Sequence, residues 1–463
     1  MKREGKPMSG AFERLRSMMS STKGGAVEKP EPKPMMMLGS PAAPNAESGE
    51  YVVPTMDMVK AYVDGRVFAN GIIRHKDFLY EVPDIDLDYD FAYDYMERTY
   101  KPDFSLFGAM SKRPHRAVPR MGGGCSVVRK GNFFGRNFDW TYDDKAYFVI
   151  RTPAIHGRHA TVGMAGNVNG LTDDFVKTRN FSEEGYRILP FFTFDGINDA
   201  GVFAATLVAP PGDKGFTTGT NRDAPTSMCV HMAIRFILDN FDNAHDAAYA
   251  FENINNYGMY AKDGSVSEEL HFLVGDPRES YVVEFINNRT TIHKVGYGEE
   301  YPIRPILTNF HVTDTQYDRE TGHIVESTCE DHANGIERYN KIGETVDGIT
   351  TFEQMQALMV AIKYTNAYNR EMNPYWYSEV FGDYTEMGGG DVTIHTPKGS
   401  YDTIIDIFID RFLNRTRTTD KDKSTWQSVF SCTYDIEKRS FAVVSQEESI
   451  ANALTFKLKQ GDK

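Results

Sequence analysis

The chain has 463 residues, a formal net charge of −14 at pH 7, 40 % apolar residues and 25 % charged residues. This composition is typical of a soluble globular protein, and the acidic balance argues against an extended nucleic-acid-binding surface. The four cysteines lack the paired spacing of a disulfide framework or a zinc site, and they fit a reducing compartment; they are Cys125, Cys229, Cys329 and Cys432.

Residues 1–50 are expected to form a disordered leader. The stretches EKPEPKP (28–34) and GSPAAPNAESGE (39–50) are rich in Pro, Gly, Ala and charge, and such segments bury too little apolar surface to order themselves. The N-terminus lacks the apolar run of a signal peptide, and Met35–Leu38 is too short to span a bilayer. A cytoplasmic protein without a membrane span is therefore expected.

Residues 51–124 have a different pattern. Short helices are expected within 58–72 and within the acidic, tyrosine-rich stretch 84–100. The segment ends in Gly122–Gly124, and three glycines allow backbone geometries that other residues avoid.

After Gly124 the sequence favours strands. Residues 125–130 and 132–138 predict a hairpin around a tight turn at Lys130–Gly131. Strand character continues through 145–153 and 159–166. Two further strands, 191–197 and 201–209, flank a turn at Asn198–Gly201.

The rest of the chain mixes helices and strands. Residues 225–253 show helical spacing, and Asn243 is expected to cap a second helix there. A hairpin is expected over 270–276 and 280–286. A helix over 352–364 follows Thr350 with Glu353 three residues on, the spacing of a capping box. Strands return at 426–435 and 440–446, and this layout predicts an α+β fold rather than regular βαβ alternation.

Cys125 stands in the region with the most chemical content. A cysteine at a chain start has its thiol beside its own α-amine, whose pKa is about 7.7–8.0, so the amine can take the thiol proton without a histidine. Arg136 and Asp139, returned by the hairpin, could set the charge and orientation of that terminus, and a nearby arginine raises the thiolate fraction. Taken singly, a cysteine in a strand is more often buried packing.

Together these residues resemble a known family. Cys125–Val128 followed by GRNFDW (135–140) is similar to the mature N-terminus of the linear amide C–N hydrolases, the choloylglycine hydrolase family. That family includes bile salt hydrolases and penicillin V acylases, with acid ceramidase and N-acylethanolamine acid amidase as more distant relatives. Later blocks that fit in the same order are 194–202, 307–309 and 337–339.

The resemblance implies a four-layer αββα sandwich of the N-terminal-nucleophile hydrolase type. It also implies that Cys125 is nucleophile and, through its freed amine, general base, and that Arg136 and Asp139 hold the catalytic terminus. Asn309 would be a polar anchor near the scissile carbonyl, although a strand-end turn residue is an equal alternative. Arg338 would support the nucleophile, although a charge on a helix surface is the more common role.

Self-processing is implied as well. Cleavage between Gly124 and Cys125 would divide the chain into a leader (1–50), a pro-segment or α-subunit (51–124) and a catalytic domain (125–463). Neither an organic cofactor nor a metal is expected. One departure from the family is Val208, which stands where relatives carry an asparagine of the oxyanion hole, and valine has no side-chain donor.

The implied substrate is a small N-acyl amide with a hydrophobic acyl group, which the enzyme would cleave through a thioester. The resemblance also allows a homo-oligomer and a pro-segment that stays bound. Acyl transfer to an amine and a non-catalytic binding protein on the same scaffold stay open as alternatives. The sequence contains no recognisable local signature of a Cys–His protease. His156 and His159 invite a metal interpretation but have no ligand partner at suitable spacing.

Overall fold

The structure is a computed structural model, and the residues that it describes form most of the region after Gly124 and part of the region before it. They are 68, 71–75, 79–100, 125–141, 146–166, 171–209, 221, 223–260, 266–268, 270–286, 289–327, 335–363, 426–445 and 450–458. The predicted leader, most of the helix expected within 58–72, Cys329 and the Gly122–Gly124 approach lie outside these residues.

The larger of two main sheets contains, within the described residues, nine strands. In spatial order they are β1 (Ile73–Arg74), β2 (Leu79–Val82), β5 (Tyr147–Thr152), β6 (Thr161–Gly166), β7 (Thr193–Asn198), β8 (Phe203–Val208), β13 (Leu270–Gly275), β14 (Ser280–Ile286) and β15 (Arg289–Val295). All neighbouring pairs are antiparallel except β2 with β5, which is parallel.

The second sheet contains six strands in the described part of the chain. Their spatial order is β16 (Ile306–Leu307), β3 (Ser126–Lys130), β4 (Phe133–Thr141), β19 (Trp426–Asp435), β20 (Ser440–Ser445) and β21 (Leu454–Lys457). Three short two-stranded ladders complete the described sheets: β9 (Ser227–Cys229) with β10 (Asn255–Tyr257), β11 (Met259–Tyr260) with β12 (Val266–Glu268), and β17 (Thr315–Tyr317) with β18 (Ile324–Ser327).

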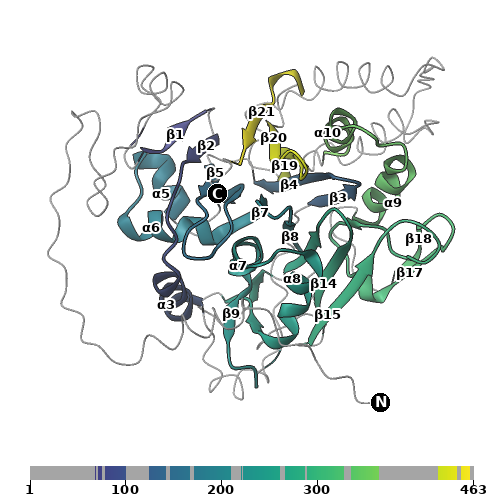
Figure 1. The fold of residues 1–463 in the computed structure, drawn as a ribbon, viewed down its shortest axis with the longest axis horizontal. Coiled ribbons are helices and arrows are strands. Elements are labelled where there is room, and N and C mark those ends of the chain that lie inside the picture. Colours follow the sequence, from purple (N-terminus) through teal and green to yellow (C-terminus); the bar gives the residue numbers. More distant parts are fainter. Residues whose placement is uncertain are drawn as a thin grey trace, which may run out of the picture.

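Helices cover the outer faces of both main sheets (Figure 1). The nine-stranded sheet carries α3 (Tyr89–Tyr100), α5 (Leu171–Thr178), α6 (Glu183–Ile188), α7 (Ala233–Asn240) and α8 (Ala244–Tyr249). The six-stranded sheet carries α9 (Gly335–Val346) and α10 (Phe352–Ala361). Single-turn 3₁₀ helices lie at Leu189–Phe192, Val230–Met232, Ala250–Asn253, Val312–Asp314 and Ile450–Asn452.

The two main sheets pack face to face through aromatic rings. Phe134 of β4 stacks on Phe203 of β8 with ring centroids 4.1 Å apart, and Phe138 of β4 stacks on Phe194 of β7 at 4.4 Å. Because side chains alternate along a strand, each sheet presents one face to this layer and the other to its helices. The predicted α+β fold with four αββα layers is confirmed.

The hairpin expected after Gly124 is present, with its turn one residue later than predicted. Lys130 pairs with Phe133, so the turn residues are Gly131 and Asn132 rather than Lys130 and Gly131. Gly131 has φ +59°, a conformation that glycine adopts without a steric penalty.

Two local predictions are wrong in detail. Residues 227–229, expected within a helix, form β9 and pair in parallel with β10. The capping box of α10 uses Thr351 and Gln354 instead of Thr350 and Glu353, because Thr351 directly precedes the first helical residue, Phe352. The predicted Asn243 cap is confirmed, since its side chain accepts a hydrogen bond from the backbone N–H of Asp246.

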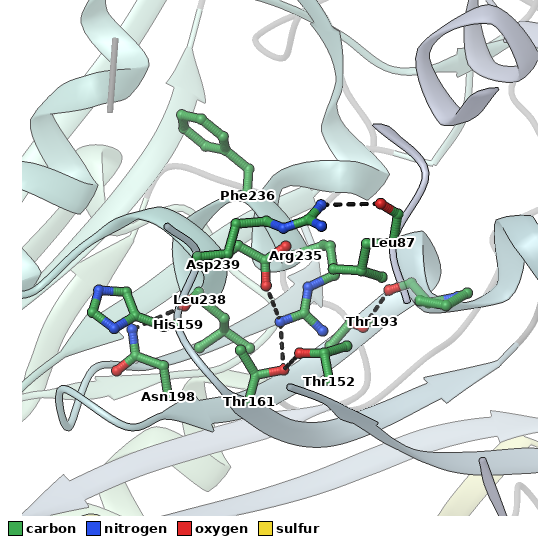
Figure 2. Close-up of polar contacts among 12 residues, drawn as sticks. Leu87, Thr152, His159, Thr161, Thr193, Asn198, Arg235, Phe236, Leu238 and Asp239 are labelled. Atoms are coloured by element: carbon green, nitrogen blue, oxygen red, sulfur yellow. Dashed lines mark hydrogen bonds and ion pairs between the residues drawn. The ribbon is translucent and has the colours of Figure 1, made fainter. Parts of the chain in front are cut away.

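The described part of 51–124 is built into the larger sheet. β2 extends the sheet beside β5, and the predicted helix within 84–100 is confirmed as α3. Beneath α3, a buried ion pair joins Arg235 and Asp239 at 2.5 Å, and Arg235 also donates to Thr161 (Figure 2). Tyr89 of α3 donates to the other oxygen of Asp239 at 2.5 Å, so the upstream segment completes a polar network of the core.

Within the described residues, the structure contains no helix long and apolar enough to cross a membrane. The cytoplasmic location stays a prediction.

Candidate active site

The β3–β4 hairpin carries three of the five predicted site residues. Its register pairs Ser126 with Asn137 and Val127 with Arg136. Cys125, directly before β3, therefore lies beside the strand segment that contains Arg136 and Asp139. The sequence separation of these residues is small, and the tight turn is what returns them to the same end of the hairpin.

Cys125 is buried at the start of β3, with 3 % of its surface exposed. Its sulfur lies 3.9 Å from the backbone oxygen of Asp139. Its own carbonyl accepts a hydrogen bond from Arg338 at 2.9 Å. The structure thus holds the thiol in the layer between the sheets, with its backbone fixed by an arginine from another element.

Arg136 crosses from the smaller sheet to the larger one. Its guanidinium donates to the carbonyl of Thr206 at 3.0 Å, and its Nε lies 3.4 Å from the carboxylate of Asp195. Burial alone would lower the pKa of Arg136, but the neighbouring Cys125 and the carboxylates of Asp195 and Asp139 raise it above its ordinary value. Arg136 is therefore a permanent positive charge beside the thiol.

Asp139 is fully buried and accepts a hydrogen bond from Ser428. Its second carboxylate oxygen lies 3.7 Å from Arg338 and makes no hydrogen bond among the described residues. Burial raises the pKa of Asp139 to about 7, although Arg338, Ser428 and Arg136 act in the opposite direction. This carboxyl group can hold or release a proton near neutral pH.

Asn309 reaches the site from the strand next to β3. β16 pairs Leu307 with Val127, so the residues that follow β16 run toward Cys125. The side chain of Asn309 is buried and donates to the carbonyl of Val208 at 2.7 Å. Val208, whose side chain has no hydrogen-bond donor, thus contacts Asn309 through its backbone carbonyl.

Arg338 links the other site residues. It projects from α9 and is buried, so the expected alternative of a surface charge is wrong. One guanidinium nitrogen donates to the carbonyl of Cys125, and the other donates to the Asn309 side chain, each at 2.9 Å. The structure therefore brings together all five predicted residues.

Three buried residues of the site were not predicted. Asp195 faces Arg136, and Tyr434 donates to the carboxylate of Asp195. Ser428 donates to Asp139. Asp195 lies in the 194–202 block that resembles the family, which could have signalled it. Ser428 and Tyr434 lie on β19 and have no local signal.

The histidines considered as metal ligands lie elsewhere. His156 is exposed in a turn, and His159 contacts the carboxylates of Asp199 and Asp242 at 2.6 and 3.3 Å. A surface groove beside α3 is lined by Asp86–Asp90, His156, Arg158 and Arg187. None of these residues contacts Cys125 in the described structure.

Residues 128–309 match the family "Linear amide C-N hydrolases, choloylglycine hydrolase family". The predicted family resemblance is confirmed. The match is to hydrolases of C–N bonds in linear amides, the enzyme class that the sequence predicted. Among curated proteins, none matches the chain.

Solved structures align with the chain at low identity. A variant of conjugated bile acid hydrolase from Clostridium perfringens aligns with 12 % identity and a TM-score of 0.42, over 72 % of this chain and 92 % of that one. A second variant of it gives 13 % and 0.40 over the same shares. Penicillin V acylase from Agrobacterium tumefaciens gives 13 % and 0.35, over 72 % and 86 %.

Proposed function

We propose that this chain is a self-processing cysteine hydrolase that cleaves the amide bond of an N-acyl substrate through a thioester. The observation that carries the proposal is the contact set of Arg338, which binds the carbonyl of Cys125 and the side chain of Asn309 and faces Asp139. A buried thiol surrounded by two arginines, a carboxyl group and an amide has the parts that covalent amide hydrolysis requires.

The first reaction in this proposal is cleavage of the chain itself. The Cys125 sulfur attacks the carbonyl carbon of Gly124, the C–N bond to Cys125 breaks, and a thioester forms. Water then hydrolyses the thioester and leaves a free α-amine on Cys125. Gly124 lies outside the described residues, so support comes from the Cys125 side, where Arg338 holds the carbonyl of the attacking residue.

Turnover repeats this chemistry on a substrate. The freed α-amine accepts the thiol proton, since its ordinary pKa of about 7.7–8.0 leaves part of it unprotonated near neutral pH. The thiolate attacks the acyl carbon, the amine product leaves with a proton, and water releases the acid. The positive charge of Arg136 lies beside the attacking sulfur. The buried Asp139 oxygen without a hydrogen bond is an acceptor for the new ammonium group.

The charge that develops on the acyl oxygen needs donors. Asn309 uses one amide hydrogen on Val208, and a primary amide has two, so one remains for the oxyanion. Losing a single such donor costs about 2.7–4 kcal/mol of transition-state stabilisation. Asn309 therefore has the larger role in this chain, in which Val208 supplies no side-chain donor.

The upstream segment is proposed to stay bound after cleavage. β2 is hydrogen-bonded to β5, and Tyr89 of α3 supplies a buried hydrogen bond to Asp239. Departure of the segment would expose the edge of β5 and remove that donor, and leaving a buried acceptor unpaired costs about 1–3 kcal/mol. In this proposal 51–124 acts as a subunit of the mature enzyme.

A panel of N-acyl amides with hydrophobic acyl chains tests the proposed activity. We expect wild-type protein to release equal amounts of acid and amine, and Cys125→Ala protein to release neither. Mass spectrometry of the quenched reaction should show the acyl group on the fragment that begins with Cys125. Turnover by the Cys125→Ala protein would overturn the mechanism.

Added amine acceptors distinguish hydrolysis from acyl transfer. We expect free acid to remain the main product when an acceptor amine is present. A new amide formed in its place would assign the acyl-transfer alternative. Substrate binding without any product would assign the binding-protein alternative.

A further inference from the structure

A second buried cluster lies beside the segment that carries Asn309. It consists of His271 on β13, Glu284 on β14 and His311 after β16, all nearly or fully buried. Phe272 pairs with Val283, so His271 and Glu284 are the next cross-strand neighbours. His311 follows Asn309 by two residues. The cluster therefore joins the larger sheet to the segment that approaches Cys125.

The ligand atoms of the three residues converge. One nitrogen of His271 and one of His311 lie 3.5 and 3.6 Å from the same oxygen of Glu284, and all three ligand atoms lie within 4.8 Å of one another. These distances exceed an ordinary N–H···O hydrogen bond of about 2.7–3.2 Å. They match the separation of about 3.3–3.6 Å between ligands held 2.0–2.2 Å from a tetrahedral metal ion.

Several hydrogen-bond donors fix the orientation of the Glu284 carboxylate. Its first oxygen accepts the backbone N–H of Val312 at 2.7 Å, and its second accepts the backbone N–H and hydroxyl of Thr313 at 2.9 and 2.7 Å. Hydrogen bonds of this kind orient the carboxylate ligands of metal sites. The second oxygen also faces His293, which is 23 % exposed, so the cluster approaches the surface on that side.

The three side chains are chemically suited to a cation, because Glu284 supplies a carboxylate oxygen and His271 and His311 each supply an imidazole nitrogen. Neutral imidazole and carboxylate are the forms in which these side chains bind metals.

We propose that His271, Glu284 and His311 form a buried binding site for a divalent transition-metal ion of the Zn²⁺ type. Two histidines and one glutamate are a known ligand set for Zn²⁺. The ion stabilises the segment after β16 against β13 and β14, and so fixes the approach of Asn309 to Cys125. The inference does not depend on the proposed function, because no residue of the cluster takes part in the proposed reaction.

Metal content of the full-length protein tests the site. The Cys125→Ala protein is the starting point, because it lacks the thiol that could bind Zn²⁺ at the other site. After incubation with Zn²⁺ and dialysis, elemental analysis should give about one ion per chain. Glu284→Gln and His271→Gln should weaken Zn²⁺ binding at least tenfold, by the scale of losses seen for groups that support a metal. His159→Gln, a partly exposed histidine that contacts two aspartates, is the matched control and should bind like the parent.

A second measurement covers the case in which the cluster variants do not fold. Zn²⁺ should raise the Tm of the parent protein, a chelator should reverse the shift, and a Co²⁺-loaded sample should show a visible spectrum without a thiolate charge-transfer band. Absence of a bound ion after loading with Zn²⁺ or Co²⁺ would overturn the proposal, and the cluster would then be a hydrogen-bonded carboxylate alone. Unchanged affinity in folded Glu284→Gln protein would overturn it equally.

Discussion

The charges around Cys125 and those beneath α3 are both buried, yet only the first cluster contains a thiol. Around Cys125, Arg136 faces Asp195 at 3.4 Å and Arg338 faces Asp139 at 3.7 Å. These are long contacts. The guanidinium groups donate hydrogen bonds to carbonyls and to Asn309 rather than to the carboxylates. The carboxyl groups can therefore bind other partners.

Beneath α3, the pairing is tighter. Arg235 lies 2.5 Å from Asp239, and the second oxygen of Asp239 accepts from Tyr89. Arg235 also donates to Thr161, which bonds to Thr152 (Figure 2). Here the charged groups bind one another, and the network joins the upstream segment to the core.

The difference indicates that buried charge alone does not identify an active site. A buried ion pair at short range, such as Arg235 with Asp239, serves structure or specificity. A thiol next to a cation, with a carboxyl group held 3.7 Å from its arginine, has capacity left for chemistry. The predictions below test this distinction.

The largest effect is expected from Cys125→Ser. The hydroxyl is a much weaker nucleophile than a thiolate, so amide hydrolysis should fall by roughly a thousandfold or more, as for other nucleophile replacements. The Tm should change little, because the side chains are similar in size. Steady-state kinetics and thermal unfolding of the same preparation measure both. Retained activity would remove Cys125 from the mechanism.

Lysine substitutions at Arg338 and Arg235 should separate an effect on activity from an effect on stability. Lysine keeps the charge but loses the planar set of donors. Arg338→Lys should lower kcat about a hundredfold, the effect of losing one donor that supports the transition state. Arg235→Lys should destabilise the protein by about 1–3 kcal/mol without lowering kcat of the folded enzyme. Equal losses of kcat in both variants would contradict the distinction.

The active-site carboxyl groups predict how stability depends on pH. Burial raises the pKa of Asp139 to about 7 and that of Asp195 to about 6, against roughly 3.9 in the unfolded chain. The folded state therefore binds more protons between these values, and the free energy of unfolding falls as pH rises toward 7. The slope is at most about 1.4 kcal/mol per pH unit for each group.

Denaturant titrations of Cys125→Ala protein between pH 5 and pH 8 measure this slope. Carboxylates with lowered pKa values, such as Glu284, titrate below pH 5 and do not change the free energy of unfolding within this range. Replacing Asp139 by Asn should flatten the curve between about pH 6 and pH 7, where its titration dominates. A slope unchanged by Asp139→Asn would contradict a raised pKa for this group.

The last comparison concerns two neighbouring tyrosines of α3. Tyr89→Phe removes a hydrogen bond to a buried carboxylate and should cost about 1.5–3 kcal/mol. Tyr93→Phe is the matched control, because its hydroxyl is buried without a hydrogen bond among the described residues, and its removal should be neutral or stabilising. Equal destabilisation by both changes would show that the Tyr89 hydrogen bond does not stabilise the network.

The sequence predicted best what is local. Cys125, Arg136 and Asp139 share one hairpin, whose strand pattern and glycine turn are visible in the chain. Errors of one residue at Gly131 and Thr351 arose because neighbouring residues could occupy the same turn or cap. β9 was missed because a three-residue parallel strand has too few residues to show a period of two.

Long-range contacts were harder to predict. Asn309 and Arg338 were found through resemblance, since 213 residues separate Arg338 from Cys125. Ser428, 289 residues from Asp139, occupies its place only because β19 pairs with β4. The attachment of 79–100 to the larger sheet was equally hidden, because four residues of β2 give no sign of a parallel partner.

Intact-mass spectrometry of the wild-type protein beside Cys125→Ala tests the central proposal most directly. We predict that the wild-type preparation contains a fragment beginning at Cys125 together with its upstream partner, while the variant remains whole. Native mass spectrometry of the same sample should show the two fragments as one complex. Two full-length proteins across a range of pH, or the same cleavage in both, would contradict self-processing by Cys125.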